Sequence, residues 1–253
     1  MTGDEYVASI IAKYAVPRGA SSPAEILGAK VAGPIRKWAG DWLSELSYSG
    51  SYAKGTGVHG ANDVDLFISL KSDTPGTLAT NYENLFELAQ QSGWSPTRQN
   101  VSIGITLDGT KADLVPGRIQ PGQVNYHSLY RRKKDSWTQT NVKLHVSTVQ
   151  NSGRVDEIRA LKVWRSLHGL DWPSFYLEMF VIEVLSGKLK GALAANVLAT
   201  LEQIENSLTT WRIIDPANTN NCVSDDLDAA EKSRIAGVAA ASRKEPQWGK
   251  IIW

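Results

Sequence analysis

The sequence predicts an α+β protein with two lobes, a mixed sheet flanked by helices and then a helical lobe. Apolar residues at helical spacing precede residue 50, alternating apolar and polar residues follow within 65–115, and only helical patterns remain after residue 150. Helices that are segregated from a sheet along the chain are typical of α+β folds. We therefore divide the chain into a first lobe with the sheet over 1–150 and a helical lobe over 151–253. A central cleft is expected, because ligands commonly bind between lobes.

Two helices are predicted before the sheet. Residues 4–15 form a short helix that ends near Pro17. Ser22 and Glu25 match a capping box, in which Ser22 is the N-cap and Glu25 is the third helical residue. The apolar residues that follow are spaced by three or four and predict one helix of about five or six turns; they are Leu27, Val31, Ile35, Trp38, Trp42 and Leu46.

A hairpin is the clearest strand signal. Residues 101–107 alternate between apolar and polar side chains, and Asp108-Gly109 is a strong turn signal. Residues 111–115 are then the returning strand, which we expect to end at Pro116. Asp113 therefore lies on a strand that a tight turn pairs with its neighbour.

The remaining elements follow from the same two periodicities. Residues 65–70 alternate like a strand, and residues 77–92 form a helix. After about residue 150 the strand signals stop. The helical patterns there cover residues 155–168, 173–187, 190–208 and 226–242.

Composition excludes several classes of site. The chain has 253 residues, 42% hydrophobic residues, 21% charged residues and a net charge of +1, so it has no strongly basic field for nucleic acid. Because Cys222 is the only cysteine, an intramolecular disulfide is impossible and a zinc site built from cysteines is not expected. We find neither a secretory signal nor an apolar run near the roughly 18 residues of a membrane span. A cytoplasmic protein without membrane contact is the expectation.

Two aspartates separated by one residue follow a glycine-serine turn. On a strand, Asp63 and Asp65 would lie on one face about 6.7 Å apart. Carboxylate oxygens are the ligands that Mg²⁺ prefers, and the backbone and hydroxyl of Gly50-Ser51 suit a phosphate. A solvated strand edge is the alternative for the Asp-x-Asp pair. The Asp-x-Asp pair, the glycine-serine turn and Asp113 are three independent features, and their agreement favours a metal site.

These residues resemble the DNA polymerase β-like nucleotidyltransferase superfamily, within it the group of archaeal CCA-adding enzymes, 2′-5′ oligoadenylate synthetases and bacterial cGAS-like (CD-NTase) enzymes. The likeness covers residues 47–221. Within it, residues 158–164 resemble a helix that carries a phosphate-contacting lysine, residues 173–178 resemble the start of the next helix, and residues 214–221 resemble an Asp-Pro-x-x-x-x-Asn loop. Because the sequence stops at Trp253 and lacks the cysteines of the zinc-bearing insertion of metazoan cGAS, a compact CD-NTase is the expected match.

The resemblance implies a polymerase β-like sheet and a role for the acidic residues. Asp63, Asp65 and Asp113 would hold two Mg²⁺ ions, or Mn²⁺ in their place, and Asp113 would help to lower the pKa of an attacking hydroxyl. The substrates would be NTPs, with ATP expected, and pyrophosphate would leave as the nucleotide is joined to the acceptor. A cyclic or linear oligonucleotide second messenger is the implied product, and antiviral defence is the implied role.

Four further residues are expected to contact the nucleotide by the same resemblance. Gly50 and Ser51 would bind the terminal phosphates, and Lys162 and Ser174 would approach the same triphosphate from the helical lobe. For Lys162 the alternative is a snorkelling lysine on an amphipathic helix. For Ser51 and Ser174 the alternative is capping of a helix.

Other residues are weaker candidates. Lys54 and Thr56 flank the glycine-serine turn, and phosphate contact or surface placement explains them equally well. Tyr176 is a candidate for stacking on the base. The four histidines lack paired spacing, so none is assigned to a metal.

RNA is the alternative acceptor. Arg131–Lys134 is a dense basic run, and a solvated strand end is its default interpretation. The functional interpretation is an RNA contact, for which nearby aromatic side chains could stack on bases: Tyr126, Tyr130 and Trp137. Template-independent nucleotide addition to an RNA or tRNA end, or to another macromolecule, is therefore the second hypothesis, and a nucleotide sensor without catalysis is the third. Base choice and oligomeric state stay open.

Overall fold

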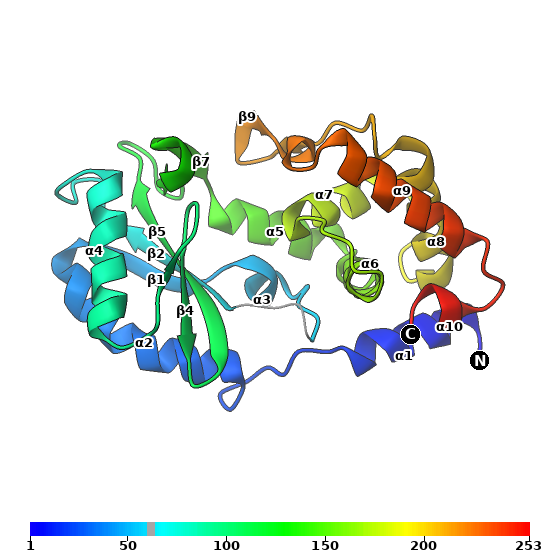
Figure 1. Cartoon of the computed structure of the whole chain (residues 1–253), viewed down its shortest axis with the longest axis horizontal. Helices are drawn as coiled ribbons and strands as arrows, with labels where there is room; N and C mark the ends of the chain where they lie inside the picture. Colours follow the sequence, from blue (N-terminus) through cyan, green and yellow to red (C-terminus); the bar gives the residue numbers. More distant parts are fainter. Residues whose placement is uncertain (60–63) are drawn as a thin grey trace. The chain divides into compact units, whose positions relative to one another are not determined.

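The computed structural model describes residues 1–59 and 64–253, so that Asp63 lies outside the described residues. The chain divides into two compact units (Figure 1). We call them the sheet unit, with segments Pro17–Ala53 and Asn62–Val146, and the helical unit, with segments Met1–Val16, Lys54–Ala61 and Ser147–Trp253. The predicted central cleft stays a prediction.

The sheet unit is built on a mixed sheet with seven strands among the described residues. Their bounds are β1 (Leu43–Tyr48), β2 (Val64–Leu70), β3 (Thr97–Arg98), β4 (Ile103–Leu107), β5 (Thr110–Ile119), β6 (His127–Arg131) and β7 (Ser136–Thr140). The order is β1-β2-β5-β4-β3, with β6 paired to β5 and β7 to β6. Strands β2 and β5 are parallel and the other pairs are antiparallel. The predicted mixed sheet is therefore confirmed.

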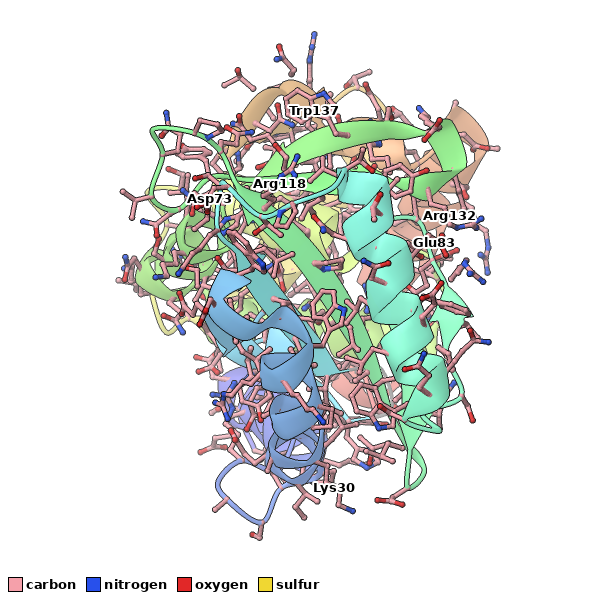
Figure 2. All side chains as sticks on the ribbon, turned by 90° about the vertical axis from the view of Figure 1, so that its left-hand side faces the viewer. Lys30, Asp73, Glu83, Arg118, Arg132 and Trp137 are labelled. Carbon is pink, nitrogen blue, oxygen red and sulfur yellow. The ribbon has the colours of Figure 1, made fainter. Side chains whose placement is uncertain are left out.

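Two helices cover one face of this sheet. Figure 2 shows α2 (Pro23–Ala39) and α4 (Leu78–Gln91) lying across it. Alternate residues of β2 join these helices in one hydrophobic cluster; they are Val64, Leu66, Ile68 and Leu70. Burial of a side chain of this size stabilises the fold by about 1.5–3 kcal/mol. Because side chains alternate along a strand, Asp65, Phe67 and Ser69 of β2 point to the opposite face.

The first helix of the sheet unit begins as predicted, but only half of the expected capping box forms. The hydroxyl of Ser22 accepts the N–H of Glu25 at 3.3 Å. The N–H of Ser22 donates to the carbonyl oxygen of Gly19 at 2.8 Å. The carboxylate of Glu25 instead accepts the hydroxyl groups of Tyr48 and Tyr52, at 3.0 and 2.9 Å. Glu25 thus ties the helix to the sheet.

The predicted long helix is wrong beyond Ala39. Gly40 has a φ of +50° and ends α2, and the short turn η1 (Gly40–Trp42) leads into β1. Leu46 is then a strand residue paired with Ile68. With a ψ of −133°, Gly40 has a backbone conformation that side-chain-bearing residues rarely adopt and that no helix can continue, and the helical spacing of the apolar residues beyond it is coincidental.

The predicted hairpin is confirmed, and its second strand is longer than expected. Asp108 and Gly109 both have positive φ and join β4 to β5. Strand β5 continues past Pro116 because its partner changes: β4 pairs with residues 110–114 and β6 with residues 117–119. Pro116, which has no N–H, lies in the gap between these two partners.

The helical unit holds the first helix and the C-terminal helices with a short hairpin among them. Their bounds are α1 (Gly3–Lys13), α6 (Val155–Leu167), α7 (Ser174–Val184), α8 (Leu193–Ser207), β8 (Ile214–Asp215), β9 (Asn218–Cys222), η3 (Val223–Asp226), α9 (Ala229–Arg243) and α10 (Trp248–Ile251). Two further helices, α3 (Gly50–Lys54) and α5 (Val142–Ser152), contain boundaries between the units. No helix of the described residues is long and apolar enough to cross a membrane.

The first helix belongs to the helical unit. Val7, Ile10 and Ile11 of α1 are buried in the same cluster as Trp164 of α6 and Phe180 of α7. The predicted division assigned residues 1–150 to one lobe, and the compact units differ from it at this end of the chain. The reason is that the apolar stripe of α1 packs on the C-terminal helices.

Strand signals were expected to stop after residue 150, and this is wrong for the short hairpin β8-β9. The carboxylate of Asp215 accepts the N–H of Ala217 at 2.8 Å and the side-chain amide of Asn221 at 3.2 Å. The Asp-Pro-x-x-x-x-Asn pattern therefore closes a turn, with its first and last residues bonded to each other.

Candidate active site

The two described aspartates of the predicted metal set lie on neighbouring strands. Asp65 on β2 is the register partner of Asp113 on the parallel strand β5. Paired residues on adjacent strands lie about 4.8 Å apart and point to the same face. The structure thus brings Asp65 and Asp113 together.

Gly50 approaches Asp65 closely. The N–H of Ser49 donates to the carbonyl oxygen of Asp65 at 2.8 Å, and α3 begins at the next residue. Gly50 has a φ of +56°, and a Cβ atom there would lie 1.8 Å from Oδ2 of Asp65. Glycine is therefore required for two reasons, its backbone conformation and the carboxylate against it. Ser51 follows in the same short helix.

We expect Gly50→Ala to destabilise the protein more than Gly93→Ala. Both glycines have positive φ, and in the left-handed region this costs alanine about 1–2 kcal/mol. A Cβ atom at Gly93 would meet nothing within 4 Å, whereas at Gly50 it would overlap the carboxylate of Asp65. The overlap should add about 1–3 kcal/mol to the loss of unfolding free energy. Urea denaturation measures both, and equal losses would show that the close approach does not matter.

Gln99, which the sequence analysis did not single out, orients Asp113. Its Nε2 donates to Oδ1 of Asp113 at 2.7 Å, while its Oε1 accepts the hydroxyl of Ser102 at 2.9 Å, so both ends of the amide are fixed. Gly104 is paired with Asp113 across β4 and β5, and a Cβ atom there would lie 2.8 Å from Nε2 of Gln99. This glycine leaves the space that the amide occupies. No local pattern marks Gln99, because strand pairing alone brings it to Asp113.

The donor set at this point is made of carboxylate oxygens, which suit Mg²⁺ or Mn²⁺. Within residues 1–59 and 64–253 there is no group of three or more His, Cys, Asp or Glu side chains placed to hold a metal ion. The third member of the predicted set, Asp63, is not among these residues. The Gly50 turn leaves room for the Asp65 carboxylate, as a ligand role would need. The two-metal site stays a prediction.

A buried histidine lies on the same face as Asp65. His127 is in edge contact with Phe67, with ring centroids 4.8 Å apart. Its Nδ1 lies 3.0 Å from the carbonyl oxygen of Asn125, which only accepts, so Nδ1 donates. Nε2 of the neutral ring then accepts the hydroxyl of Ser69 at 2.7 Å. Burial lowers the pKa of His127, which favours this neutral form.

Protonation of His127 should make the protein less stable at mildly acidic pH. Because its folded pKa is lowered, its contribution is complete above its ordinary pKa of 6.5 and is lost as pH falls from there toward the folded pKa. Between pH 6.5 and 5 the unfolding free energy of the wild type should fall more steeply than that of His127→Gln, by less than about 1.4 kcal/mol per pH unit. Urea denaturation across this range measures the slope of unfolding free energy against pH. The control is His59→Gln, a substitution at an exposed histidine. Parallel slopes for wild type and His127→Gln would contradict the assignment.

Lys162 lies in a buried ion-pair cluster of the helical unit. Its Nζ donates to Oε1 of Glu178 at 2.6 Å and to the hydroxyl of Thr56 at 3.0 Å. The hydroxyl of Thr56 donates in turn to Oε1 of Glu178 at 2.6 Å. Lys54 donates to Oε2 of Glu178 at 2.8 Å, and its ammonium group lies 4.6 Å from the ring centre of Phe175. We call Lys54, Thr56, Lys162 and Glu178 the lysine cluster.

The lysine cluster is buried and carries one net positive charge, from two ammonium groups and one carboxylate. Lys162 is 1% exposed and is not a snorkelling lysine, and Lys54 and Thr56 are not surface residues. Burial alone would raise the pKa of Glu178, but Lys54 and Lys162 hold it below its ordinary value. Burial lowers the pKa of Lys162, and Glu178 opposes this effect. The phosphate contact of Lys162 stays a prediction.

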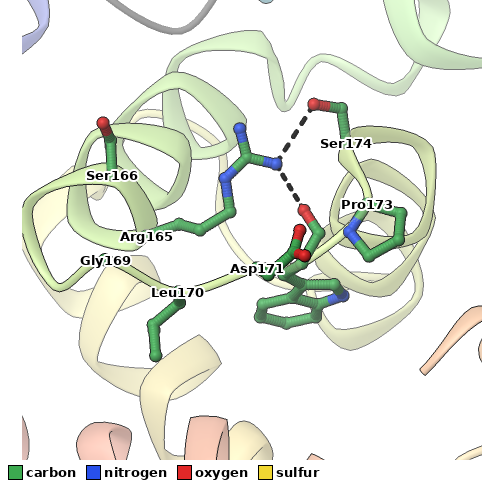
Figure 3. Close-up of a pocket in the computed structure, with 8 residues that line it drawn as sticks. Arg165, Ser166, Gly169, Leu170, Asp171, Pro173 and Ser174 are labelled. Atoms are coloured by element: carbon green, nitrogen blue, oxygen red, sulfur yellow. Dashed lines mark hydrogen bonds between the residues drawn. The ribbon is translucent and has the colours of Figure 1, made fainter. Parts of the chain in front are cut away.

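Ser174 begins α7 and lines a pocket of about 420 Å³ (Figure 3). Its hydroxyl accepts an N–H of Arg165 at 3.1 Å, so it does not serve as the expected helix cap; the N-cap residue is Pro173. Arg165 also donates to the carbonyl oxygen of Trp172 at 2.5 Å.

Tyr176 is fully buried, and the centre of its ring lies 5.5 Å from that of Trp172. The prediction that Tyr176 stacks on a base is therefore wrong.

The basic run Arg131–Lys134 closes the hairpin between β6 and β7, as the default interpretation predicts (Figure 2). Nε of Arg132 donates to the carbonyl oxygen of Gln99 at 3.2 Å, and the N–H of Lys133 donates to Oδ1 of Asn100 at 3.2 Å. The run therefore holds the loop that carries Gln99. Trp137 on β7 is 58% exposed. RNA contact stays a prediction.

Comparison with known proteins gives relatives in sequence and in structure. No protein-family model matches the chain. The chain is 25% identical over 162 residues to the cyclic AMP-AMP-AMP synthase of Escherichia coli (strain MS 115-1), a match that covers 58% of this chain and 50% of that protein. The chain thus spans about half the length of the curated relative it matches.

Three solved structures share the fold. CdnC of E. coli MS115-1, in a complex with HORMA-deltaN, has a TM-score of 0.78 at 18% identity, covering 98% of this chain and 96% of that chain. The CD-NTase CdnG of Bradyrhizobium diazoefficiens, in complex with GTP, has a TM-score of 0.73 at 11% identity, covering 96% and 92%. The CdnE c-UMP-AMP synthase of Rhodothermus marinus has a TM-score of 0.62 at 15% identity, covering 96% and 98%. The predicted resemblance is therefore confirmed: the chain has the polymerase β-like fold of the CD-NTase group over almost its whole length.

Proposed function

We propose that the chain is a metal-dependent nucleotidyltransferase that joins NTP-derived nucleotides to a hydroxyl acceptor and makes a cyclic or linear oligonucleotide second messenger. The observation that carries the proposal is the pairing of Asp65 with Asp113 on parallel strands, with the Gly50 turn against the first carboxylate. The fold shared with CD-NTases and the sequence similarity to a cyclic AMP-AMP-AMP synthase support it, and the latter favours ATP as a substrate.

In this proposal the acidic residues organise an in-line displacement. Asp63, Asp65 and Asp113 would hold two Mg²⁺ ions, or Mn²⁺, which would supply charge neutralisation at the phosphates and a lowered pKa for the attacking hydroxyl. The hydroxyl oxygen forms a bond to the α-phosphorus, and the bond to the bridging oxygen breaks to release pyrophosphate. Gln99 keeps the Asp113 carboxylate in one orientation, so that little reorganisation accompanies the reaction.

The remaining predicted residues would bind the triphosphate. Gly50 and Ser51 would do so through the backbone N–H groups and the hydroxyl at the start of α3. Lys162 and Ser174 would act from the helical unit. The net positive charge of the lysine cluster supports an electrostatic contribution of Lys162, whereas direct contact with a phosphate would require its ammonium group to leave Glu178 or Thr56.

Labelled ATP distinguishes the proposal from its main alternative. The purified chain is incubated with ATP labelled at the α-phosphate, the other three NTPs and Mg²⁺, with and without total RNA, and the products are separated by size. The proposal predicts label in small oligonucleotides under both conditions. Label that appears only in RNA-sized products would favour nucleotide addition to RNA ends, for which the exposed Trp137 beside the basic run is the supporting observation. No transfer of label would contradict both.

A further inference from the structure

The pocket beside Ser174 presents an arginine whose bonding capacity is only partly used. Arg165 lies on α6 and is half-buried. Both of its hydrogen bonds, to Ser174 and to the carbonyl oxygen of Trp172, leave the same nitrogen, Nη1 (Figure 3). Within the described part of the chain, no hydrogen bond or ion pair is formed by Nε or Nη2 of Arg165. A guanidinium group carries five N–H donors, so several remain available to a ligand.

The loop that forms this pocket is firmly held. Gly169, with a φ of +58°, ends α6, and the N–H of Leu170 donates back to the carbonyl oxygen of Arg165 at 3.0 Å. This is the pattern of a Schellman motif, which fixes the chain as it leaves a helix. On the other side, Arg234 of α9 donates to the carbonyl oxygen of Gly169 at 3.1 Å. The pocket is therefore preformed, which reduces the entropy lost when a ligand binds.

The charges around the pocket favour an anion. Burial lowers the pKa of Arg165, and the carboxylates of Glu178 and Asp171 oppose this effect, so the guanidinium stays protonated. Glu178 is already engaged by the two ammonium groups of the lysine cluster. Asp171 also lines the pocket, but it is exposed and its charge is screened by water. The charge of Arg165 thus lacks a buried partner of its own.

The first turn of α7 adds to this preference. The helix has 11 residues, no acidic residue in its first turn and no side-chain hydrogen bond at its N-cap. Its first N–H groups, next to Ser174, therefore carry the positive end of the helix dipole. This feature alone would not make a site, but it acts in the same direction as Arg165.

We infer that Arg165 is a further phosphate-binding residue, which forms with Ser174 an anion site for the phosphate chain of the nucleoside triphosphate. The inference rests on the proposed function for the identity of the ligand. It places the exposed part of the phosphate contact one helical turn beyond Lys162, whose ammonium group is already bonded to Glu178 and Thr56 and is almost inaccessible. Arginine suits this role because its planar fork matches two phosphate oxygens.

The test is calorimetric titration of metal-free protein with inorganic tripolyphosphate and with ATP, in a buffer that contains EDTA. Removal of a charge-assisted hydrogen bond should raise Kd about tenfold to hundredfold, so Arg165→Gln should bind both ligands correspondingly more weakly. Arg243→Gln is the matched control, because it removes one arginine charge from the same unit, where Arg243 bonds to Glu202 and Glu205 and does not line the pocket. Its Kd should stay within about twofold of the wild type.

Each outcome decides the inference separately from the proposed function. Unchanged binding in Arg165→Gln, or no binding of tripolyphosphate by the wild type, overturns the inference even if the protein makes oligonucleotides. Weakened binding in Arg165→Gln together with no nucleotidyl transfer by the wild type retains the phosphate site and removes the proposed reaction. Should Arg165→Gln fail to fold, Arg165→Lys keeps the charge and loses the fork. It should then bind about threefold to tenfold more weakly than the wild type, and wild-type affinity in that variant would reject the site.

Discussion

Replacing Asp113 with asparagine should lower the rate of pyrophosphate release from ATP by at least about a hundredfold. The change removes one negative charge from the carboxylate pair while keeping its shape, and loss of one such electrostatic partner typically costs 10²–10³ in rate, on the order of 3–4 kcal/mol. The unfolding free energy should change by less than about 1 kcal/mol, because Asp113 is half-buried and asparagine can still accept from Gln99. Stopped assays of pyrophosphate at saturating Mg²⁺ measure the effect.

Asp108→Asn is the matched control for this prediction. Asp108 lies at the turn of the same hairpin, pairs with the exposed Lys30 and has a positive φ that asparagine also tolerates. It should retain the wild-type rate. An Asp113→Asn protein that is as active as Asp108→Asn would remove the paired aspartates from the mechanism.

Replacing Glu178 should have a large effect on the free energy of unfolding. Glu178→Leu should lower the unfolding free energy by about 3–5 kcal/mol, because it leaves the ammonium groups of Lys54 and Lys162 buried without a carboxylate. The double variant with Lys162→Met should recover part of this loss, since it removes one of the stranded charges. Urea denaturation of the wild type, Glu178→Leu and the double variant measures the three unfolding free energies.

The contribution of Glu178 to the unfolding free energy should also depend on pH. Because the charges of the two lysines hold the folded pKa of Glu178 low, its stabilising effect is complete above its ordinary pKa of 4.5 and is lost as pH falls below that value.

Glu202→Gln is the control for Glu178→Leu, because Glu202 forms a half-exposed pair with Arg243, and exposed pairs are worth about 0–1 kcal/mol. Losses of similar size for Glu178→Leu and Glu202→Gln would mean that the lysine cluster is not a buried charge network.

The part of the candidate site that the sequence predicts rests on local patterns. Alternation around Asp65 and the Asp108-Gly109 turn place two aspartates on strands, and the structure pairs them in register. Positive φ at Gly50 is likewise a local property of a turn residue. These predictions agree with the structure because strand alternation and tight turns depend on a few neighbouring residues.

What the sequence does not predict depends on contacts between distant segments. Helical spacing carries the predicted helix through Trp42 and Leu46, although Gly40 ends it and the following residues pair with β2. Nothing near Gln99 indicates that its amide will reach Asp113. Burial of Glu178 between two lysines requires three segments to meet, so a short pattern around any one of them is not informative.

We expect carboxylates on neighbouring strands to bind a pair of metal ions beside a triphosphate. Anomalous diffraction from crystals grown with Mn²⁺ and a nonhydrolysable ATP analogue would locate these ions. We predict two peaks about 3.5–4 Å apart, with oxygen atoms of Asp63, Asp65 and Asp113 about 2.0–2.2 Å from them. Ordered nucleotide with no peak at these three side chains would exclude a metal site there.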